Sequence, residues 1–304
     1  MLTMKLRGAG VLFAASLSAL AAACGGSIAP PPSRMPDAKT AVARLDATYE
    51  GVTGIKGTAK IDFLGDKGRV RGDLQVLVHG PASLRFAVTA NVVGGAGEVA
   101  SDGFKFEADD KQNGRYLVGE AKPCNIARIT QVPLPSTELV PMLWGMRPKI
   151  DGPIVCDSID WSDEGYYTVM LGSEHGLAHE LHVAPVPDDW SKPYGEQRMR
   201  LLGVVGWSGS GSEASLMYRV TMKDHEAATT APGIVAEDPL DEDVPPSGPM
   251  VTVDVPRTIH VEVPDRNSDV IFKYESAALN PPLYEGVFQL NLTPGVPVDR
   301  ADCE

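Results

Sequence analysis

Hydrophobic and polar side chains alternate along much of the chain from residue 58 onward. In residues 69–78, Val70, Leu74, Val76 and Val78 point one way, while arginine, aspartate and glutamine side chains point the other. Glycine-containing turns separate such stretches at short intervals, as at residues 65–68 and 113–114. A period of two with frequent turns is typical of antiparallel sheet with one buried face. We therefore expect a mainly β protein with few helices.

The expected strands form two groups, separated by a proline-rich segment. They cover residues 58–64, 69–78, 84–92, 104–106 and 116–118, and then 166–171, 177–184, 199–206, 216–222, 259–263 and 270–272. A last strand over residues 287–292 is expected to close the sheet.

Two segments follow the helical period instead. In residues 37–49, Ala41, Val42, Leu45 and Tyr49 share one face of an amphipathic helix. Between residues 124 and 150, four prolines exclude a regular strand. There we expect a short helix over residues 136–144, capped by Ser136, whose apolar side chains cover the sheet as a lid. These side chains are Leu139, Val140, Met142, Leu143 and Trp144.

The first 23 residues resemble a bacterial lipoprotein signal peptide. Lys5 and Arg7 precede an apolar run over residues 11–20, which is too short to span a bilayer as an anchor. Small residues then lead to Cys24, where a lipobox would place a diacylglycerol on the thiol. The usual lipobox has leucine three residues before the cysteine, and this chain has Ala21 there. Ordinary secretion with cleavage near Ala23 is the alternative.

These features predict the organisation of the chain. Residues 1–23 are the signal peptide, 24–36 a lipidated, flexible Gly/Pro-rich tether, and 37–304 a single barrel domain. Bacterial lipoproteins with aspartate after the acylated cysteine tend to stay in the inner membrane. Gly25 at that place implies, by analogy, the outer membrane with the domain on the periplasmic side.

Charge narrows the range of partners. The chain has 27 Lys and Arg against 40 Asp and Glu, a net charge of −13. Such a charge argues against nucleic acid and against anionic lipid head groups as ligands. The negative residues are dense between residues 225 and 249, where prolines interrupt them. We expect a solvated insertion there, with a weak divalent-cation site as the alternative.

Cysteine chemistry allows at most one internal disulfide. With Cys24 acylated, Cys124, Cys156 and Cys303 remain in an oxidising compartment. We favour Cys124–Cys156, because the two bracket the compact proline-rich segment. The alternatives, in which Cys303 pairs with Cys124 or with Cys156, stay open.

No motif indicates catalysis. His175, His179 and His182 would share a face of a helix, but the flanking alternation favours a strand, which sends His179 and His182 to opposite faces. Residues 206–210 approach a nucleophile elbow and read better as a hairpin turn. Residues 95–100 match a dinucleotide pattern without the helix it requires. We expect no enzyme activity, no cofactor and no metal site.

Four short stretches resemble the Lol lipoprotein carrier and acceptor family. They are residues 78–86 (VHGPASLRF), 100–106 (ASDGFKF), 134–139 (LPSTEL) and 143–145 (LWG). The resemblance implies an incomplete, half-open antiparallel β-barrel that curls around an apolar cavity and a helical lid. This chain departs from the family in its greater length and in its acidic insertion.

The resemblance also implies an outer-membrane lipoprotein that binds apolar chains, either lipoprotein acyl chains or lipid. A structural or interaction lipoprotein with a filled core on the same fold is the alternative. Anchored family members carry an exposed apolar loop between two early strands, and Val92 and Val93 lie in such a glycine-rich loop. The residues expected at the apolar site are Phe86, Val88, Val92, Val93, Leu139, Met142, Leu143 and Trp144.

The lipid anchor predicts the behaviour of a Cys24→Ser variant. Without the thiol no diacylglycerol is added, so the variant should appear as an unprocessed or soluble form. Membrane fractionation of the host, with mass spectrometry of the N-terminal peptide, measures this. A variant that still partitions with membranes through a lipid-free N-terminus would show that the lipobox interpretation is wrong.

Overall fold

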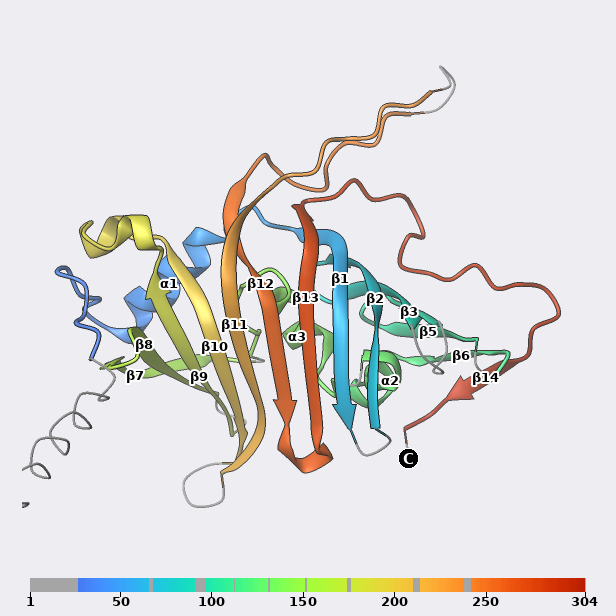
Figure 1. Cartoon of the computed structure of the whole chain (residues 1–304), viewed down its shortest axis with the longest axis horizontal. Coiled ribbons are helices and arrows are strands. Elements are labelled where there is room, and N and C mark those ends of the chain that lie inside the picture. The colour runs from blue at the N-terminus through green and yellow to red at the C-terminus, as the bar shows by residue number, and fades with distance from the viewer. Residues whose placement is uncertain are drawn as a thin grey trace, which may run out of the picture.

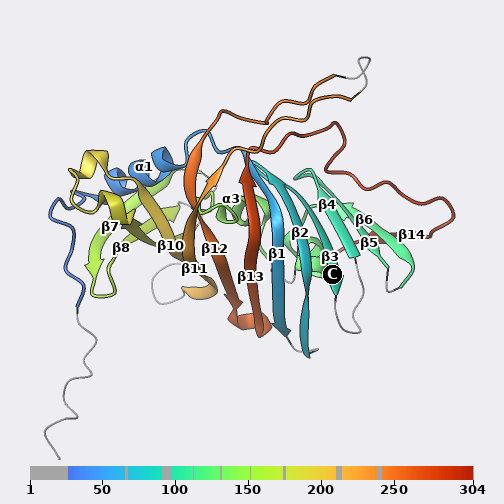
Figure 2. The ribbon, with the colours of Figure 1, turned by 45° about the horizontal axis from the view of Figure 1, so that its top comes forward.

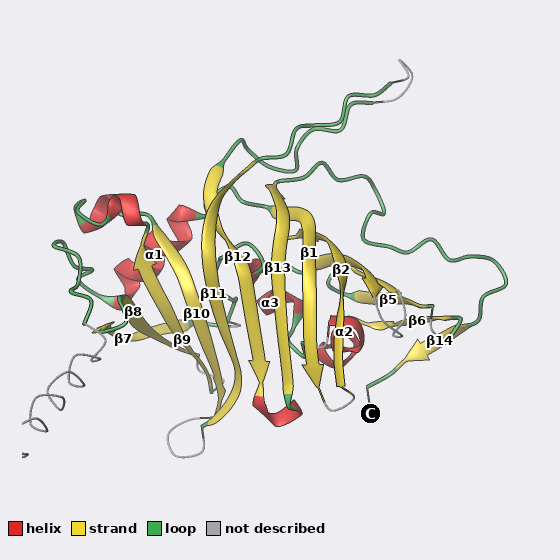
Figure 3. Ribbon diagram, viewed as in Figure 1, coloured by secondary structure: helices red, strands yellow, loops and turns green. Residues whose placement is uncertain are grey.

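A single curved sheet with helices on its inner side makes up the protein (Figures 1 and 3). The computed structural model describes residues 27–65, 68–90, 97–111, 113–130, 132–150, 152–173, 176–209, 214–237 and 242–303. Within these residues the sheet has 14 strands in the order β14-β6-β5-β4-β3-β2-β1-β13-β12-β11-β10-β9-β8-β7.

The first half of the sheet is formed by β1 (Gly54–Gly65), β2 (Gly68–His79), β3 (Ser83–Ala90), β4 (Gly97–Ser101), β5 (Lys105–Asp110) and β6 (Arg115–Glu120). The second half is formed by β7 (Ile154–Ser162), β8 (Tyr166–Ser173), β9 (Leu177–Pro185), β10 (Met199–Ser208), β11 (Ser215–Thr229), β12 (Thr252–Val263) and β13 (Ser268–Leu279). The helices are α1 (Ala38–Thr48), α2 (Pro123–Thr130) and α3 (Ser136–Met142), and short 3₁₀ turns occur at Pro187–Asp189, Tyr194–Glu196 and Pro264–Arg266.

The two halves join in the middle of the sheet, where β1 pairs antiparallel with β13. The sheet ends at β14 (Val298–Ala301) on one side and at β7 on the other. In the described part of the chain these end strands do not pair with each other, so the barrel stays open. The prediction of a half-open, mainly antiparallel barrel curled around helices is confirmed.

The two-residue period places apolar side chains on the inner face. Val76 on β2 lies opposite Phe86 on β3, and Phe86 lies opposite Val99 on β4. All three side chains are buried. Since strand residues two apart share a face, the same register carries Leu74 and Val78 inward as well.

Helix α1 covers the inner face of the second half, where it contacts β10, β7 and β8 (Figure 2). Its N-cap is Asp37, whose side chain accepts a hydrogen bond from Thr40 N at 2.7 Å. Ala41, Val42 and Leu45 are buried, as the helical period predicts. The expected helix over residues 37–49 is therefore confirmed.

Helices α2 and α3 cover the first half, with α2 against β4 and β5 and α3 against β3. The N-cap of α3 is Pro135 with no side-chain hydrogen bond, so the predicted Ser136 cap is wrong. Ser136 is instead the first helical residue. Helix α2 was not among the expected elements, although it begins with a proline, Pro123. Proline at a first helical position is in fact favourable, since its missing N–H has no partner there.

The Gly/Pro-rich tether is not free along its length. Tyr194 N donates to Ser33 Oγ at 2.9 Å, Met35 N donates to Tyr167 Oη at 3.1 Å, and Met35 is buried. Ile28 N donates to Asp163 O at 3.0 Å. The expected flexible stalk is therefore wrong for residues 28–35, which are bound to the β7–β8 end of the sheet. Cys24 and the expected signal peptide lie outside the described residues.

The acidic segment forms an arm that extends away from the sheet (Figures 1 and 2). Strand β11 continues to Thr229, so the insertion expected from residue 225 begins later. Beyond Thr229, Ile234 and Val244 form an antiparallel bridge within the arm.

The C-terminal segment differs from its prediction. Residues 287–292 form no strand, and they cross the outer face of the sheet, where Arg85 Nη1 donates to Val287 O at 2.9 Å. The chain then ends in β14, which pairs in parallel with β6. Local alternation cannot reveal so short a strand.

The disulfide joins Cys124 and Cys303, whose Cα atoms are 6.0 Å apart. The predicted Cys124–Cys156 bridge is therefore wrong. Cys156 belongs to β7, at the far end of the sheet from the α2–β14 region. The bridge spans 179 residues of sequence and holds β14 against β6.

Replacing Cys303 by serine should destabilise the protein strongly. Closing a loop of this length contributes about 5 kcal/mol in the chain-entropy account of disulfides. Urea unfolding of Cys303→Ser measures the loss, and Cys156→Ser is the matched control with little expected change. Peptide mapping under non-reducing conditions should recover Cys124 linked to Cys303, and a bridge to Cys156 would contradict the structure.

Candidate functional site

The residues expected at the apolar site meet between the sheet and its helices. Leu139, Met142, Leu143 and Trp144 are each at most 3% exposed. They belong to one core cluster with Phe86, and the partly buried Val88 packs against it. Val92 and Val93 lie outside the described residues. The structure thus brings the described members of the predicted site into one apolar interior.

The segment after α3 is fixed at two places. Tyr274 Oη on β13 donates to Leu143 O at 3.2 Å. Arg147 donates to both carboxylate oxygens of Asp46 on α1, at 2.9 and 2.8 Å. Such a bidentate pair fixes orientation as well as distance. The lid is therefore attached to the middle of the sheet and to α1.

Helix α3 also brings a carboxylate into the interior. Tyr218 Oη on β11 donates to Glu138 Oε2 at 2.8 Å, and His179 Nε2 on β9 lies 3.1 Å from Tyr218 Oη. All three side chains are buried. Gly206 on β10 makes room for the phenol, because a Cβ there would lie 2.4 Å from a ring carbon of Tyr218. Three strands and one helix thus form a buried polar cluster.

The protonation of this cluster follows from its burial. Burial, and then the positive charge of Arg147, lowers the pKa of His179 to about 4, so its imidazole is neutral. Burial and the Glu138 charge raise the pKa of Tyr218 well above its usual value. The hydroxyl group of Tyr218 has one proton, which it donates to Glu138. The phenol oxygen therefore accepts a hydrogen bond from His179, and we assign the imidazole proton to Nε2. Nδ1 is then a bare acceptor.

Two of the buried polar atoms that lack a hydrogen-bond partner in the described part of the chain belong to the apolar site and its polar cluster. They are Trp144 Nε1, a donor, and His179 Nδ1, an acceptor. A buried polar group without a hydrogen bond typically costs about 1–3 kcal/mol. The interior therefore offers one donor and one acceptor to a molecule that reaches it.

Of the histidines singled out in the sequence, His179 and His182 point to opposite faces of β9. On β9, His179 faces the interior, and His182 lies on the outer face beside Glu180 at 2.8 Å. The strand interpretation is confirmed, and His175 lies outside the described residues. Glu138 and Tyr218 were not among the residues expected at the site, although an acidic residue within the apolar stretch 134–144 was a usable signal. Among the described residues, no helix has the length and apolar character needed to cross a membrane.

The buried histidines predict how stability depends on pH. Burial lowers the pKa of His179 and of His225 from 6.5 to about 4. The unfolded chain therefore binds more protons below pH 6.5, and stability should fall as the pH drops from about 6.5 to about 4. Each histidine contributes about 3 kcal/mol to this loss.

Urea unfolding at pH 7 and pH 4 tests this expectation. His179→Gln should shrink the difference in unfolding free energy between the two pH values. His182→Gln replaces a histidine on the outer face of the same strand and serves as the control. An equal effect of both substitutions would contradict the assignment of the pH dependence to burial.

Comparison with known proteins supports the architecture. No family model and no curated protein matches the chain. A LolA superfamily protein from Nitrosomonas europaea matches with a TM-score of 0.51 and 12% identity, over 84% of this chain and 99% of that one. A proposed outer membrane lipoprotein-sorting domain from Vibrio parahaemolyticus gives 0.46 and 12%, over 83% and 96%. A DUF1329 family protein from Desulfovibrio piger gives 0.47 and 10%, over 83% and 95%. The chain has the Lol-type fold.

Proposed function

We propose that this chain is an outer-membrane-anchored lipoprotein that binds apolar chains, such as lipoprotein acyl chains or lipid, between its sheet and α3. The observation that carries the proposal is the interior itself. It is apolar, it is covered by a short helix, and it contains Trp144 Nε1 and His179 Nδ1 without partners. The Lol-type fold supports it.

Helix α3 is suited to exchange places with a ligand. It has seven residues and contains Pro141, which lacks a backbone N–H. Its side chains Leu139, Val140 and Met142 are buried in the apolar core. An acyl chain that replaced Leu139 and Met142 would restore the same kind of apolar contact.

Each of the two unpartnered atoms is able to form a hydrogen bond with the polar end of such a ligand. An ester or amide carbonyl would accept a hydrogen bond from Trp144 Nε1, and an amide N–H or a hydroxyl would donate to His179 Nδ1. Satisfying a buried polar group gives a binding contribution that a purely apolar chain lacks.

Two features near the ends of the chain support the proposed location. The Cys124–Cys303 disulfide supports an oxidising compartment such as the periplasm. The bound segment 28–35 leaves little free chain between Cys24 and the domain, which would keep the β7–β8 end of the sheet near the membrane.

A structural or interaction lipoprotein on the same fold is the second candidate. It is favoured by the near-complete burial of the lid side chains, since Leu143 and Trp144 fill the space that a ligand would need. On this alternative the sheet and helices form an ordinary core, and recognition occurs on the outer surface.

A Val88→Phe variant separates the two functions. Val88 on β3 is partly buried against the core and lies opposite Gly97 on β4. If the interior takes up chains, the phenyl ring should weaken binding of a fluorescent fatty acid by about tenfold and leave the melting temperature nearly unchanged. If the core is filled, overpacking should cost about 1–3 kcal/mol.

The matched control is Val235→Phe, because Val235 lies on the arm and is 76% exposed. It should alter neither binding nor melting. A parent protein that never binds the probe, with a Val88→Phe variant that melts much lower, would contradict the carrier function and favour the structural one.

A further inference from the structure

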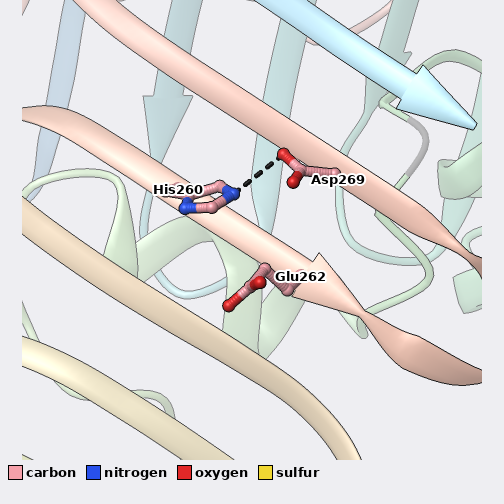
Figure 4. Close-up of side chains that lie close together, drawn as sticks. All are labelled: His260, Glu262 and Asp269. Carbon is pink, nitrogen blue, oxygen red and sulfur yellow. Dashed lines mark hydrogen bonds and ion pairs between the residues drawn. The ribbon is translucent and has the colours of Figure 1, made fainter.

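Three side chains with metal-binding atoms gather on the outer face of β12 and β13 (Figure 4). They are His260, Glu262 and Asp269, and their ligand atoms all lie within 4.8 Å of one another. This group is on the opposite side of the sheet from the apolar interior.

The strand register dictates this meeting. His260 and Glu262 are two residues apart on β12 and share a face, and Glu262 pairs directly with Asp269 on β13. The neighbouring residues Ile259 and Val261 are buried in the core. Their burial fixes the outward direction of His260 and Glu262. The site therefore rests on two adjacent strands joined by a short turn.

The arrangement places two carboxylates directly across from each other. Like charges at opposed positions of neighbouring strands repel and destabilise the pair. His260 Nε2 lies 2.8 Å from Asp269 Oδ1. Glu262 is only loosely neutralised, since Arg219 Nη1 is 3.7 Å from its Oε2. A cation bound between the carboxylates would remove the repulsion.

We propose that His260, Glu262 and Asp269 bind a divalent transition-metal ion such as Zn²⁺. One imidazole nitrogen and two carboxylate oxygens are a ligand set that zinc accepts, and three protein ligands leave a fourth position open. The side chains are 30%, 39% and 43% exposed, so the ion and a further ligand reach the site from solvent.

The chain contains its own control. Glu180 and His182 on the outer face of β9 are also 2.8 Å apart. Among the described residues, however, no third ligand completes that pair into a group of three. Any affinity due to a lone histidine–carboxylate pair, or to the general negative charge, should be the same at both places.

Calorimetric titration of the purified full-length chain with Zn²⁺ tests the proposal. One equivalent should bind, and both His260→Ala and Asp269→Asn should weaken that binding by at least about tenfold. His182→Ala should leave the affinity within about twofold. Zn²⁺ should also raise the melting temperature of the parent and of His182→Ala, and not that of His260→Ala.

A fourth variant tests the role of Glu262. Arg219→Gln removes the competing guanidinium and should strengthen zinc binding. Equal losses in His260→Ala and His182→Ala, or no binding by the parent, would overturn the proposal. Asp269→Asn retains shape and hydrogen bonding, so its effect is readable even if His260→Ala is unstable. The apolar-chain function is unaffected by either result, because its probe binds on the other face.

Discussion

Covering one wide apolar sheet face with short helices is the constraint on which the structure depends. An open sheet leaves its inner face exposed unless other elements bury it, and each 100 Å² of apolar surface left in water costs about 2.5 kcal/mol. Helix α1 covers the second half, and α2 and α3 cover the first. Because α3 has only seven residues, its position depends on side chains that fix it to its neighbours, among them Tyr274, Arg147 and Tyr218.

Local pattern was enough to predict the elements that bury a periodic face. The helix around Leu45 and the strands carrying Val76 and Phe86 are where the period places them. The predictions that failed concern features that depend on residues far apart in sequence. The partner of Cys124 lies 179 residues away, and β14 is too short to show alternation. The metal-binding group was missed similarly, since Asp269 joins His260 only through the pairing of β12 with β13.

The polar residues divide into two kinds of chemistry on the two faces of the sheet. Inside, burial keeps His179 neutral and leaves isolated polar atoms, which suits a ligand that is mostly apolar with one polar end. Outside, carboxylates and His260 remain in contact with water, where a cation is the ligand that relieves their repulsion. The same strand period therefore separates the two proposed binding chemistries by the thickness of one sheet.

The attachment of β14 limits how copies of this protein can assemble through their sheets. A strand edge with unpaired backbone groups is a template for another chain, and growth into a filament requires such an edge at both ends of the sheet. At one end the edge is a strand of four residues, held by a covalent bond to α2. In the described part of the chain the other end is β7, with nine residues, and residues 28–35 are bound beside it. A pair of copies joined through β7 would expose only the short β14 edges at its outer ends, which disfavours growth into a filament.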